Sequence, residues 1–185
     1  MLPHIPFWYL RHGQTDWNAL NLSQGNVDIP LNAVGIAQAH AAAALLAGQG
    51  IASIVASPLG RAQVTAQIVG DALGLPFATV DGLRETRFGV QEGQPMGDWF
   101  DAWIAEEFTP EGAEPFVELR ARAATAVTAA LDRAAPVLIV AHGALFRALR
   151  AEMGLPRDSR LANAAPTHCE PPAAAGAPWT LTVLT

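Results

Sequence analysis

Short apolar runs alternate with longer stretches rich in alanine and leucine along this chain of 185 residues. Five runs have the length and composition of buried strands: residues 7–10, 51–56, 77–80, 137–140 and 179–184. Five stretches have the composition of helices: residues 35–46, 58–73, 99–107, 116–134 and 143–153. Strands that alternate with helices predict an α/β fold with a mostly parallel sheet.

Three segments depart from this alternation. Residues 14–32 are rich in Asn, Asp, Ser, Gly and Pro, which predicts a long loop of a kind that is usually functional. Residues 81–93 predict a second polar loop, and residues 155–178 a proline-rich irregular segment. Ser57 and Pro58 are expected to open a helix as its N-cap and its first position.

Composition excludes several classes of protein. A hydrophobic content of 51% and a charged content of 15% rule out a disordered chain. The net charge of −6 makes the chain a poor host for nucleic acids or anionic membranes. Cys169 is the single cysteine, so neither an internal disulfide nor a cysteine-rich metal site is possible.

All eleven basic residues are arginines. Schiff-base chemistry and Walker-type phosphate binding therefore lack their lysine. The length fits a single domain over residues 1–185. Without a basic leader or an apolar run long enough to cross a bilayer, the protein is expected to be cytoplasmic.

Charged side chains follow the predicted strands at the edge of the sheet where ligands gather. Arg11 and His12 end the first strand, Arg61 follows the second, and Glu85 and His142 follow the third and fourth. A neutral imidazole can attack phosphorus, and arginine forks fit phosphate oxygens. A carboxyl group can protonate a leaving oxygen, so this set suits phosphoryl transfer.

Two other interpretations remain open on the residues alone. Each side chain taken singly could cap a helix or pair on the surface. Histidine and carboxylate side chains could also hold a metal ion. Two arginines at the same edge oppose a cation, however, and the chain has no His-x-x-His or His-Glu-x-x-His pattern.

Five ordered motifs between residues 7 and 165 resemble those of the histidine phosphatase superfamily, also called phosphoglycerate-mutase-like. They are Leu10-Arg11-His12-Gly13-Gln14-Thr15 with Asn18, Gln24-Gly25 with Asp28 and Pro30-Leu31-Asn32, Ser57-Pro58-Leu59 with Arg61, Glu85 with Phe88-Gly89 and Glu92-Gly93, and Ala141-His142-Gly143. The resemblance implies a three-layer α/β/α sandwich with a mixed, mostly parallel six-stranded sheet.

The resemblance also implies a role for each matching residue. His12 would be the nucleophile that becomes phosphohistidine, and Glu85 would protonate the leaving oxygen and later activate water. The groups expected to clamp the phosphoryl oxygens are Arg11, Arg61 and His142. The residues expected to complete substrate binding are Asn18, Gln24, Gly25, Gly143 and Arg84. The position of Arg84 and Arg87 beside Glu85, rather than the resemblance, suggests that they hold a second anionic group on the substrate.

The activity implied is that of a metal-independent phosphomonoesterase without a cofactor. Its partner would be a small-molecule phosphate ester, with no nucleic acid or membrane, and either a monomer or a homodimer is possible. Residues 94–114 are expected to form a short cap, which favours hydrolysis because little covers a phosphorylated intermediate. A phosphoglycerate mutase-type isomerase is the alternative. A non-catalytic phospholigand-binding module is disfavoured, since no catalytic residue is missing.

The roles of several further residues remain open on the sequence alone. The aromatic side chains of Trp99, Phe100 and Trp103 either pack a helix on the core or form an apolar wall beside the substrate. Arg147 and Arg150 are expected to pair with acidic neighbours. Gln14 stands where many family members have glutamate.

Overall fold

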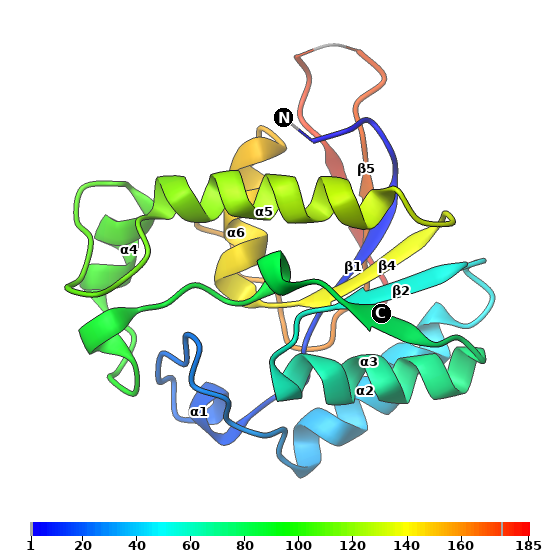
Figure 1. Cartoon of the computed structure of the whole chain (residues 1–185), viewed down its shortest axis with the longest axis horizontal. Coiled ribbons are helices and arrows are strands. Elements are labelled where there is room, and N and C mark those ends of the chain that lie inside the picture. The colour runs from blue at the N-terminus through cyan, green and yellow to red at the C-terminus, as the bar shows by residue number, and fades with distance from the viewer. Residues whose placement is uncertain (1, 175) are drawn as a thin grey trace.

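A six-stranded mixed sheet lies at the centre of the protein (Figure 1). The computed structural model describes residues 2–174 and 176–185, so Met1 and Ala175 of the predicted domain lie outside the described residues. The strands are β1 (Phe7–Arg11), β2 (Ser53–Ala56), β3 (Phe77–Thr79), β4 (Val137–Ala141), β5 (Thr167–Glu170) and β6 (Thr180–Val183). Their order is β3-β2-β4-β1-β5-β6.

The first four strands are parallel, and β5 and β6 run antiparallel to their neighbours. Successive side chains of β1 point to opposite faces, as strand geometry requires. Phe7 and Tyr9 belong to one hydrophobic core, and Trp8 and Leu10 belong to the other. The central strands are therefore buried on both sides, which explains why they read as continuous apolar runs.

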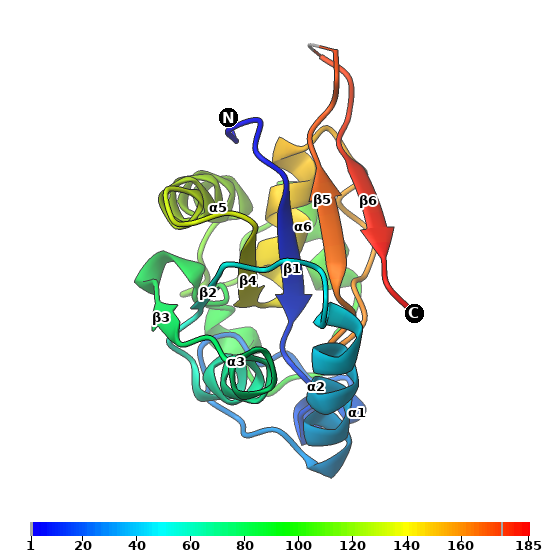
Figure 2. The ribbon, with the colours of Figure 1, turned by 90° about the vertical axis from the view of Figure 1, so that its right-hand side faces the viewer.

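Helices cover both faces of the sheet (Figure 2). They are α1 (Asp16–Ala19), α2 (Ala33–Leu46), α3 (Gly60–Leu73), α4 (Asp98–Ile104), α5 (Phe116–Leu131) and α6 (Gly143–Glu152). Buried residues of α2 and α3 pack in the core with Trp8, and those of α5 and α6 pack in the core with Phe7. The predicted three-layer α/β/α sandwich with a mixed, mostly parallel six-stranded sheet is confirmed.

Three local expectations are wrong. Strand β5 lies within residues 155–178, which were expected to be irregular, because its backbone is ordered by pairing with β1 and β6 rather than by its own composition. The one-turn helix α1 interrupts the long loop at residues 14–32. Helix α3 begins at Gly60 with Leu59 as its N-cap, so Ser57 does not cap it.

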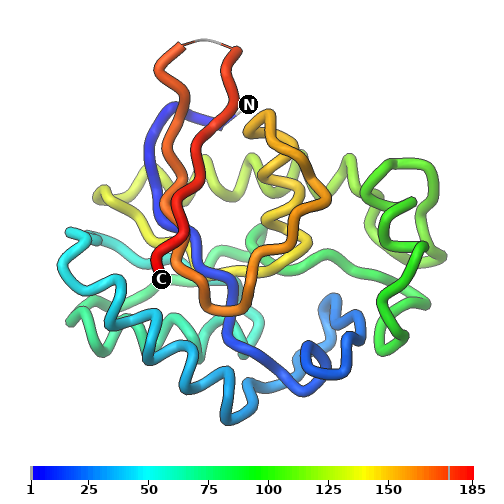
Figure 3. Tube along the Cα trace, turned by 180° about the vertical axis from the view of Figure 1, so that it is seen from behind, coloured from blue at the N-terminus to red at the C-terminus, as the bar shows by residue number. Residues whose placement is uncertain are grey.

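The connection between α6 and β5 brings a distant segment to the end of β1. Figure 3 shows this connection descending past β1 before the chain turns back into β5. There the amide of Ala164 donates to the carbonyl oxygen of Arg11 at 2.9 Å. Residues 155–166 therefore share the edge of the sheet to which Arg11 and His12 belong.

Candidate active site

His12 follows β1 and is held in one orientation by the backbone. Its amide donates to the carbonyl oxygen of Ala141 at 2.9 Å. Its Nδ1 lies 2.7 Å from the carbonyl oxygen of Gly13. Because a carbonyl oxygen can only accept, Nδ1 carries the proton and the lone pair belongs to Nε2. No protein group in the described part of the chain bonds to this Nε2.

Gly13 makes this position possible. A Cβ atom there would lie 2.3 Å from the carbonyl oxygen of Gly35 in α2. The backbone after β1 therefore packs directly on the backbone of α2, which only glycine allows. The amide of Gly13 also donates to the Thr65 hydroxyl at 3.1 Å, which ties the His12 segment to α3.

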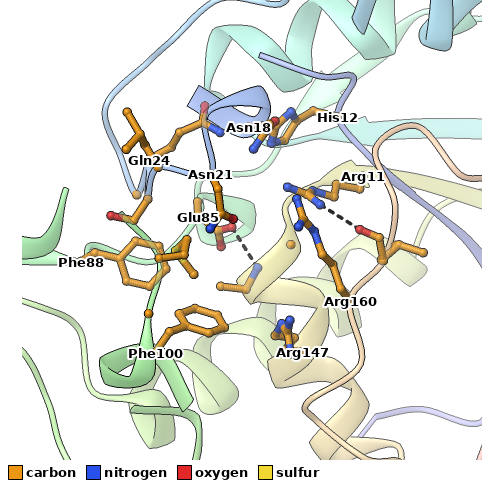
Figure 4. Close-up of a pocket in the computed structure, with 18 of the residues that line it drawn as sticks. Arg11, His12, Asn18, Asn21, Gln24, Glu85, Phe88, Phe100, Arg147 and Arg160 are labelled. Carbon is orange, nitrogen blue, oxygen red and sulfur yellow. Dashed lines mark hydrogen bonds between the residues drawn. The ribbon is translucent and has the colours of Figure 1, made fainter. Parts of the chain in front are cut away.

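A cavity of about 360 Å³ lies in front of His12. Figure 4 shows Arg11, His12, Asn18, Gln24 and Glu85 converging on it. The predicted site residues that line it are Arg11, His12, Asn18, Gln24, Gly25, Arg61, Glu85 and Gly143. His142 lies directly behind, with its ring centroid 5.2 Å from that of His12.

The two buried arginines are anchored through part of their guanidinium groups. Arg61 donates through Nη1 and Nη2 to the carbonyl oxygens of Val27 and Gly25, each at 2.8 Å. Arg11 donates through Nη1 to the carbonyl oxygen of Leu161 at 2.8 Å. The Nε atoms of both side chains are buried without a partner among the described residues. Buried polar atoms are rarely left unpaired, so these donors suit an anionic ligand.

Both site histidines are kept neutral by their surroundings. Burial, followed by the charges of Arg61 and Arg11, holds the pKa of His12 well below its ordinary range. Burial and the charge of Arg61 also hold the pKa of His142 well below that range. A neutral imidazole keeps its lone pair at neutral pH, which a nucleophile requires.

His142 is positioned by Ser57 and Tyr9. Its Nε2 lies 2.7 Å from the Ser57 hydroxyl, while its Nδ1 is buried without a partner. The Tyr9 hydroxyl donates to the carbonyl oxygen of His142 at 2.8 Å and accepts from its amide at 3.1 Å. If the Ser57 hydroxyl donates to Nε2, the proton lies on Nδ1, which can then donate to an anion.

Glu85 lies at the beginning of α6. Its Oε2 accepts from the amide of Ala144 at 2.9 Å, and its Oε1 accepts from the amides of Leu145 and Thr86 at 3.0 and 3.1 Å. These donors fix the carboxyl group at the wall of the cavity, at the positive end of the helix dipole. The sequence motif placed Glu85 in the site but gave no indication of its bonds to α6.

Asn18 and Gln24 are placed as predicted, and Asn163 joins them. The Asn18 Oδ1 accepts from the amide of Thr15 at 3.2 Å and from Asn163 Nδ2 at 3.1 Å. The side-chain Nδ2 of Asn18 is therefore left to donate toward the cavity. Asn163 also donates to the carbonyl oxygen of His12 at 2.9 Å. No local sequence pattern singles out Asn163, because its segment reaches the site only through the sheet.

Arg84 is not brought into the site. Its Nε donates to Asp81 at 2.6 Å, and it does not line the cavity. The 3₁₀ turn at Asp81–Leu83 brings this carboxylate within reach of the arginine, which explains the wrong expectation. Arg147, expected to pair with an acidic neighbour, instead lines the cavity together with Arg160. Arg150 donates to the carbonyl oxygen of Pro156 at 2.6 Å.

The aromatic residues of α4 divide between the two expected roles. Trp103 is fully buried and donates to the carbonyl oxygen of Glu114 at 2.9 Å, so it packs on the core. Phe100 packs on Phe88, with ring centroids 5.9 Å apart, and both line the cavity. Trp99 packs on Phe88 at 5.4 Å but does not line the cavity.

Two further searches cover the described residues. Within residues 2–174 and 176–185, no group of three or more His, Cys, Asp or Glu side chains could hold a metal ion. No helix in these ranges has the length and apolar character needed to cross a membrane.

The family model for the histidine phosphatase superfamily (branch 1) matches residues 7–170. The chain belongs to this superfamily. The match contains all five of the catalytic residues expected from the sequence: Arg11, His12, Arg61, Glu85 and His142.

Relatives of this histidine phosphatase superfamily member include a probable mutase and a phosphatase. It is 38% identical over 165 residues to a probable phosphoglycerate mutase of Yersinia pestis, covering 82% of this chain and 76% of the relative. It is 31% identical to a mycobacterial glucosyl-3-phosphoglycerate phosphatase solved with VO3, with a TM-score of 0.81 over 97% of this chain and 98% of that one.

A third structure supports the fold alone. The phosphoserine phosphatase of Entamoeba histolytica, solved with 3-phosphoglyceric acid, is 22% identical to this chain. Its TM-score is 0.80, over 97% of this chain and 96% of that one.

Proposed function

We propose that the protein is a metal-independent phosphomonoesterase that acts on small phosphorylated substrates through a phosphohistidine at His12. The observation that carries the proposal is the ring of His12. Its Nδ1 proton is committed to the carbonyl oxygen of Gly13 at 2.7 Å, and its Nε2 lone pair faces a cavity lined by unpaired arginine donors. A nucleophile and its charge-stabilising partners are thus held ready before substrate arrives.

In the first step, Nε2 of His12 forms a bond to phosphorus while the bond to the leaving oxygen breaks. The guanidinium groups of Arg11 and Arg61, which line the cavity, stabilise the charge on the phosphoryl oxygens. Nδ1 of His142, which has no partner among the described residues, adds a further donor. The Glu85 carboxylate, on the cavity wall, passes the proton of the phosphate monoester monoanion to the leaving oxygen, so the alcohol departs neutral.

In the second step, water attacks the phosphorus of phosphohistidine. The Glu85 carboxylate takes a proton from this water, since the group that served as acid now serves as base. The bond between phosphorus and Nε2 breaks, and the electron pair returns to the imidazole. Inorganic phosphate leaves with the proton that Glu85 took from water, and both His12 and Glu85 regain their starting protonation.

Residues 94–114 form the cap in this proposal. Within them, α4 contributes Asp98, Phe100 and Asp101 to the mouth of the cavity. Because α4 has only seven residues, we expect the cap to leave water access to the phosphohistidine. The similarity to a phosphatase along nearly the whole of both chains agrees with hydrolysis.

The second candidate is a mutase that returns the phosphoryl group to another hydroxyl. The observation that favours it is the 38% identity to a probable phosphoglycerate mutase. The two candidates differ in which nucleophile reaches phosphohistidine first, water or a substrate hydroxyl.

The experiment compares two rates on the same enzyme in excess chelator. Phosphate release from an aryl phosphate and from 3-phosphoglycerate is measured beside conversion of 3-phosphoglycerate to its 2-isomer. We expect chelator-resistant phosphate release that exceeds isomerisation. Isomerisation faster than release would establish the mutase instead, and loss of both activities in chelator would overturn the metal-independent mechanism.

A further inference from the structure

Two arginines in the cavity have no part in the mechanism above. Arg147 lies on α6, Arg160 lies in the connection between α6 and β5, and both line the cavity. In the described ranges, no carboxylate is within ion-pair distance of either guanidinium. Other arginines do pair, including Arg120 with Glu152 at 2.9 Å and Arg122 with Glu114 at 2.7 Å.

Arg147 is held rigidly with part of its guanidinium group unused. Its Nη1 donates to the carbonyl oxygens of Arg157, at 3.1 Å, and Asp158. Its planar head lies over the ring of Phe100, 5.1 Å from the centroid. Its Nε and Nη2 have no partner among the described residues. A planar pair of donors fixed in this way matches the two oxygens of an anionic group.

The same contacts fix the backbone that leads to Arg160. The carbonyl groups that Arg147 anchors belong to the segment just before Arg160 in sequence. Figure 4 shows the guanidinium groups of Arg160 and Arg11 side by side in the cavity. Burial, followed by the charge of Arg160, lowers the pKa of Arg11 to about 10. Like charges held this close repel each other until an anion lies between them.

The cavity is lined by the side chains of Arg11, Arg61, Arg147 and Arg160 and by the carboxyl-bearing residues Glu85, Asp98 and Asp101. Arg11 and Arg61 already face the phosphoryl position beside His12. Figure 4 shows Arg160 and Arg147 beyond Arg11 as seen from His12, on the side where the alcohol part of a bound ester would lie. The charges of Asp101 and Asp158 act on Arg147, and Asp98 and Asp101 line the same cavity. Among the described residues, none of these carboxylates is within ion-pair distance of Arg147 or Arg160. A second anionic group on the alcohol would accept hydrogen bonds from the guanidinium donors that these carboxylates leave unpaired.

We propose that Arg147 and Arg160 form a subsite for a second anionic group on the alcohol part of the substrate. The substrates would be phosphate monoesters whose alcohol carries a carboxylate or a second phosphate. This inference rests on the proposed function. It moves to Arg147 and Arg160 the role that the sequence had suggested for Arg84.

The test uses three esters with the same three-carbon chain. They are 3-hydroxypropyl phosphate, which is neutral at its far end, the phosphate ester of 3-hydroxypropanoate, which ends in a carboxylate, and propane-1,3-diyl bisphosphate. The ratio of kcat/KM values is measured for the wild type, Arg160→Gln and Arg147→Gln. Arg150→Gln is the matched control, because Arg150 anchors the same connection through Pro156 but does not line the cavity.

We expect the wild type to prefer one or both anionic esters by about tenfold or more over the neutral ester, since charge-assisted hydrogen bonds are the strong ones. Arg160→Gln and Arg147→Gln should each remove most of that preference, and Arg150→Gln should keep it. Preference for the carboxylate or for the bisphosphate identifies the anion. Arg160 is exposed, so its variant should fold even if the Arg147 variant does not.

Equal rates on the three esters in the wild type would overturn the subsite. So would equal losses on all three in Arg160→Gln, which would make Arg160 part of the phosphoryl site. The neutral ester separates the two hypotheses, because its hydrolysis reports the proposed function alone. If no ester is hydrolysed, calorimetry measures the dissociation constants of the same esters with the same variants. Tighter binding of the anionic esters, lost in Arg160→Gln and Arg147→Gln, then supports the subsite, and equal binding of all three esters overturns it.

Discussion

Replacing Glu85 by glutamine separates its structural role from its chemical role. The carboxylate accepts three backbone hydrogen bonds of 2.9–3.1 Å, from Ala144, Leu145 and Thr86. The side-chain oxygen of a glutamine can accept from the backbone amides of Leu145 and Thr86. Its side-chain nitrogen then faces the backbone amide of Ala144, and since both groups are donors, that amide is left without an acceptor. One buried N–H without a partner costs about 1–3 kcal/mol, and the lost charge at the start of α6 adds about 0.3–1 kcal/mol. We therefore expect Glu85→Gln to lower the free energy of unfolding by about 1–4 kcal/mol.

The chemical effect should depend on the leaving group. Loss of a general acid slows a reaction by about 10²–10⁴-fold where the leaving oxygen needs a proton, equivalent to about 3–5 kcal/mol in the barrier. An alkyl phosphate has such a leaving oxygen. A nitrophenyl phosphate leaves readily as an anion, so its phosphorylation step should slow far less.

The assay is kcat/KM for both esters, beside urea unfolding of each variant. Glu92→Gln is the control, because Glu92 accepts from the amides of Asn26 and Phe88 at 3.2 and 3.1 Å but does not line the cavity. Glu92→Gln should change kcat/KM by the same factor for both esters. Equal losses on both esters in Glu85→Gln would refute the acid role and leave Glu85 as a purely structural group.

Three further predictions concern the groups around His12. His12 and His142 are held neutral in the fold and take up protons on unfolding, so the free energy of unfolding should fall below about pH 6.5, by up to about 1.4 kcal/mol per pH unit for each. Urea titrations between about pH 7 and pH 5.5 should show this slope and a shallower one in His12→Gln; a flat wild-type profile would contradict it. Gly13→Ala should lower the free energy of unfolding by about 1–3 kcal/mol or more, because the new Cβ would overlap the backbone of Gly35. The control is Gly97→Ala, whose Cβ would have its nearest neighbour at 3.9 Å, and it should leave the free energy of unfolding in urea nearly unchanged. Ser57→Ala should lower kcat about tenfold for all esters by freeing the tautomer of His142, and Ser57→Thr should restore it; unchanged kcat in Ser57→Ala would argue against this role.

The fold could be predicted largely from local pattern. Buried parallel strands read as apolar runs, and the helices read as alanine-rich stretches. Strand β5 escaped this reasoning because Thr167 and Cys169 are buried while His168 and Glu170 lie further out, in a segment of four residues flanked by prolines. Its order depends on partners more than 150 residues away in sequence, at Phe7, Trp8 and Tyr9.

The site could be predicted where residues follow strand ends. Arg11, His12 and His142 are fixed by β1 and β4, so their convergence follows from the topology of the sheet. Arg160 and Asn163 could not be found in this way, since they lie in a connection whose path is set by tertiary contacts. Arg84 was misplaced because sequence proximity to Glu85 does not determine the direction of a long side chain.

The central claim is that the phosphoryl group passes through Nε2 of His12. The direct measurement is mass spectrometry of the enzyme quenched in base during turnover of an aryl phosphate, with the modified peptide mapped. We expect one phosphoryl group on His12 in the wild type, and neither this adduct nor phosphate release in His12→Ala. Phosphate release without an adduct on His12, or turnover retained by His12→Ala, would contradict the mechanism.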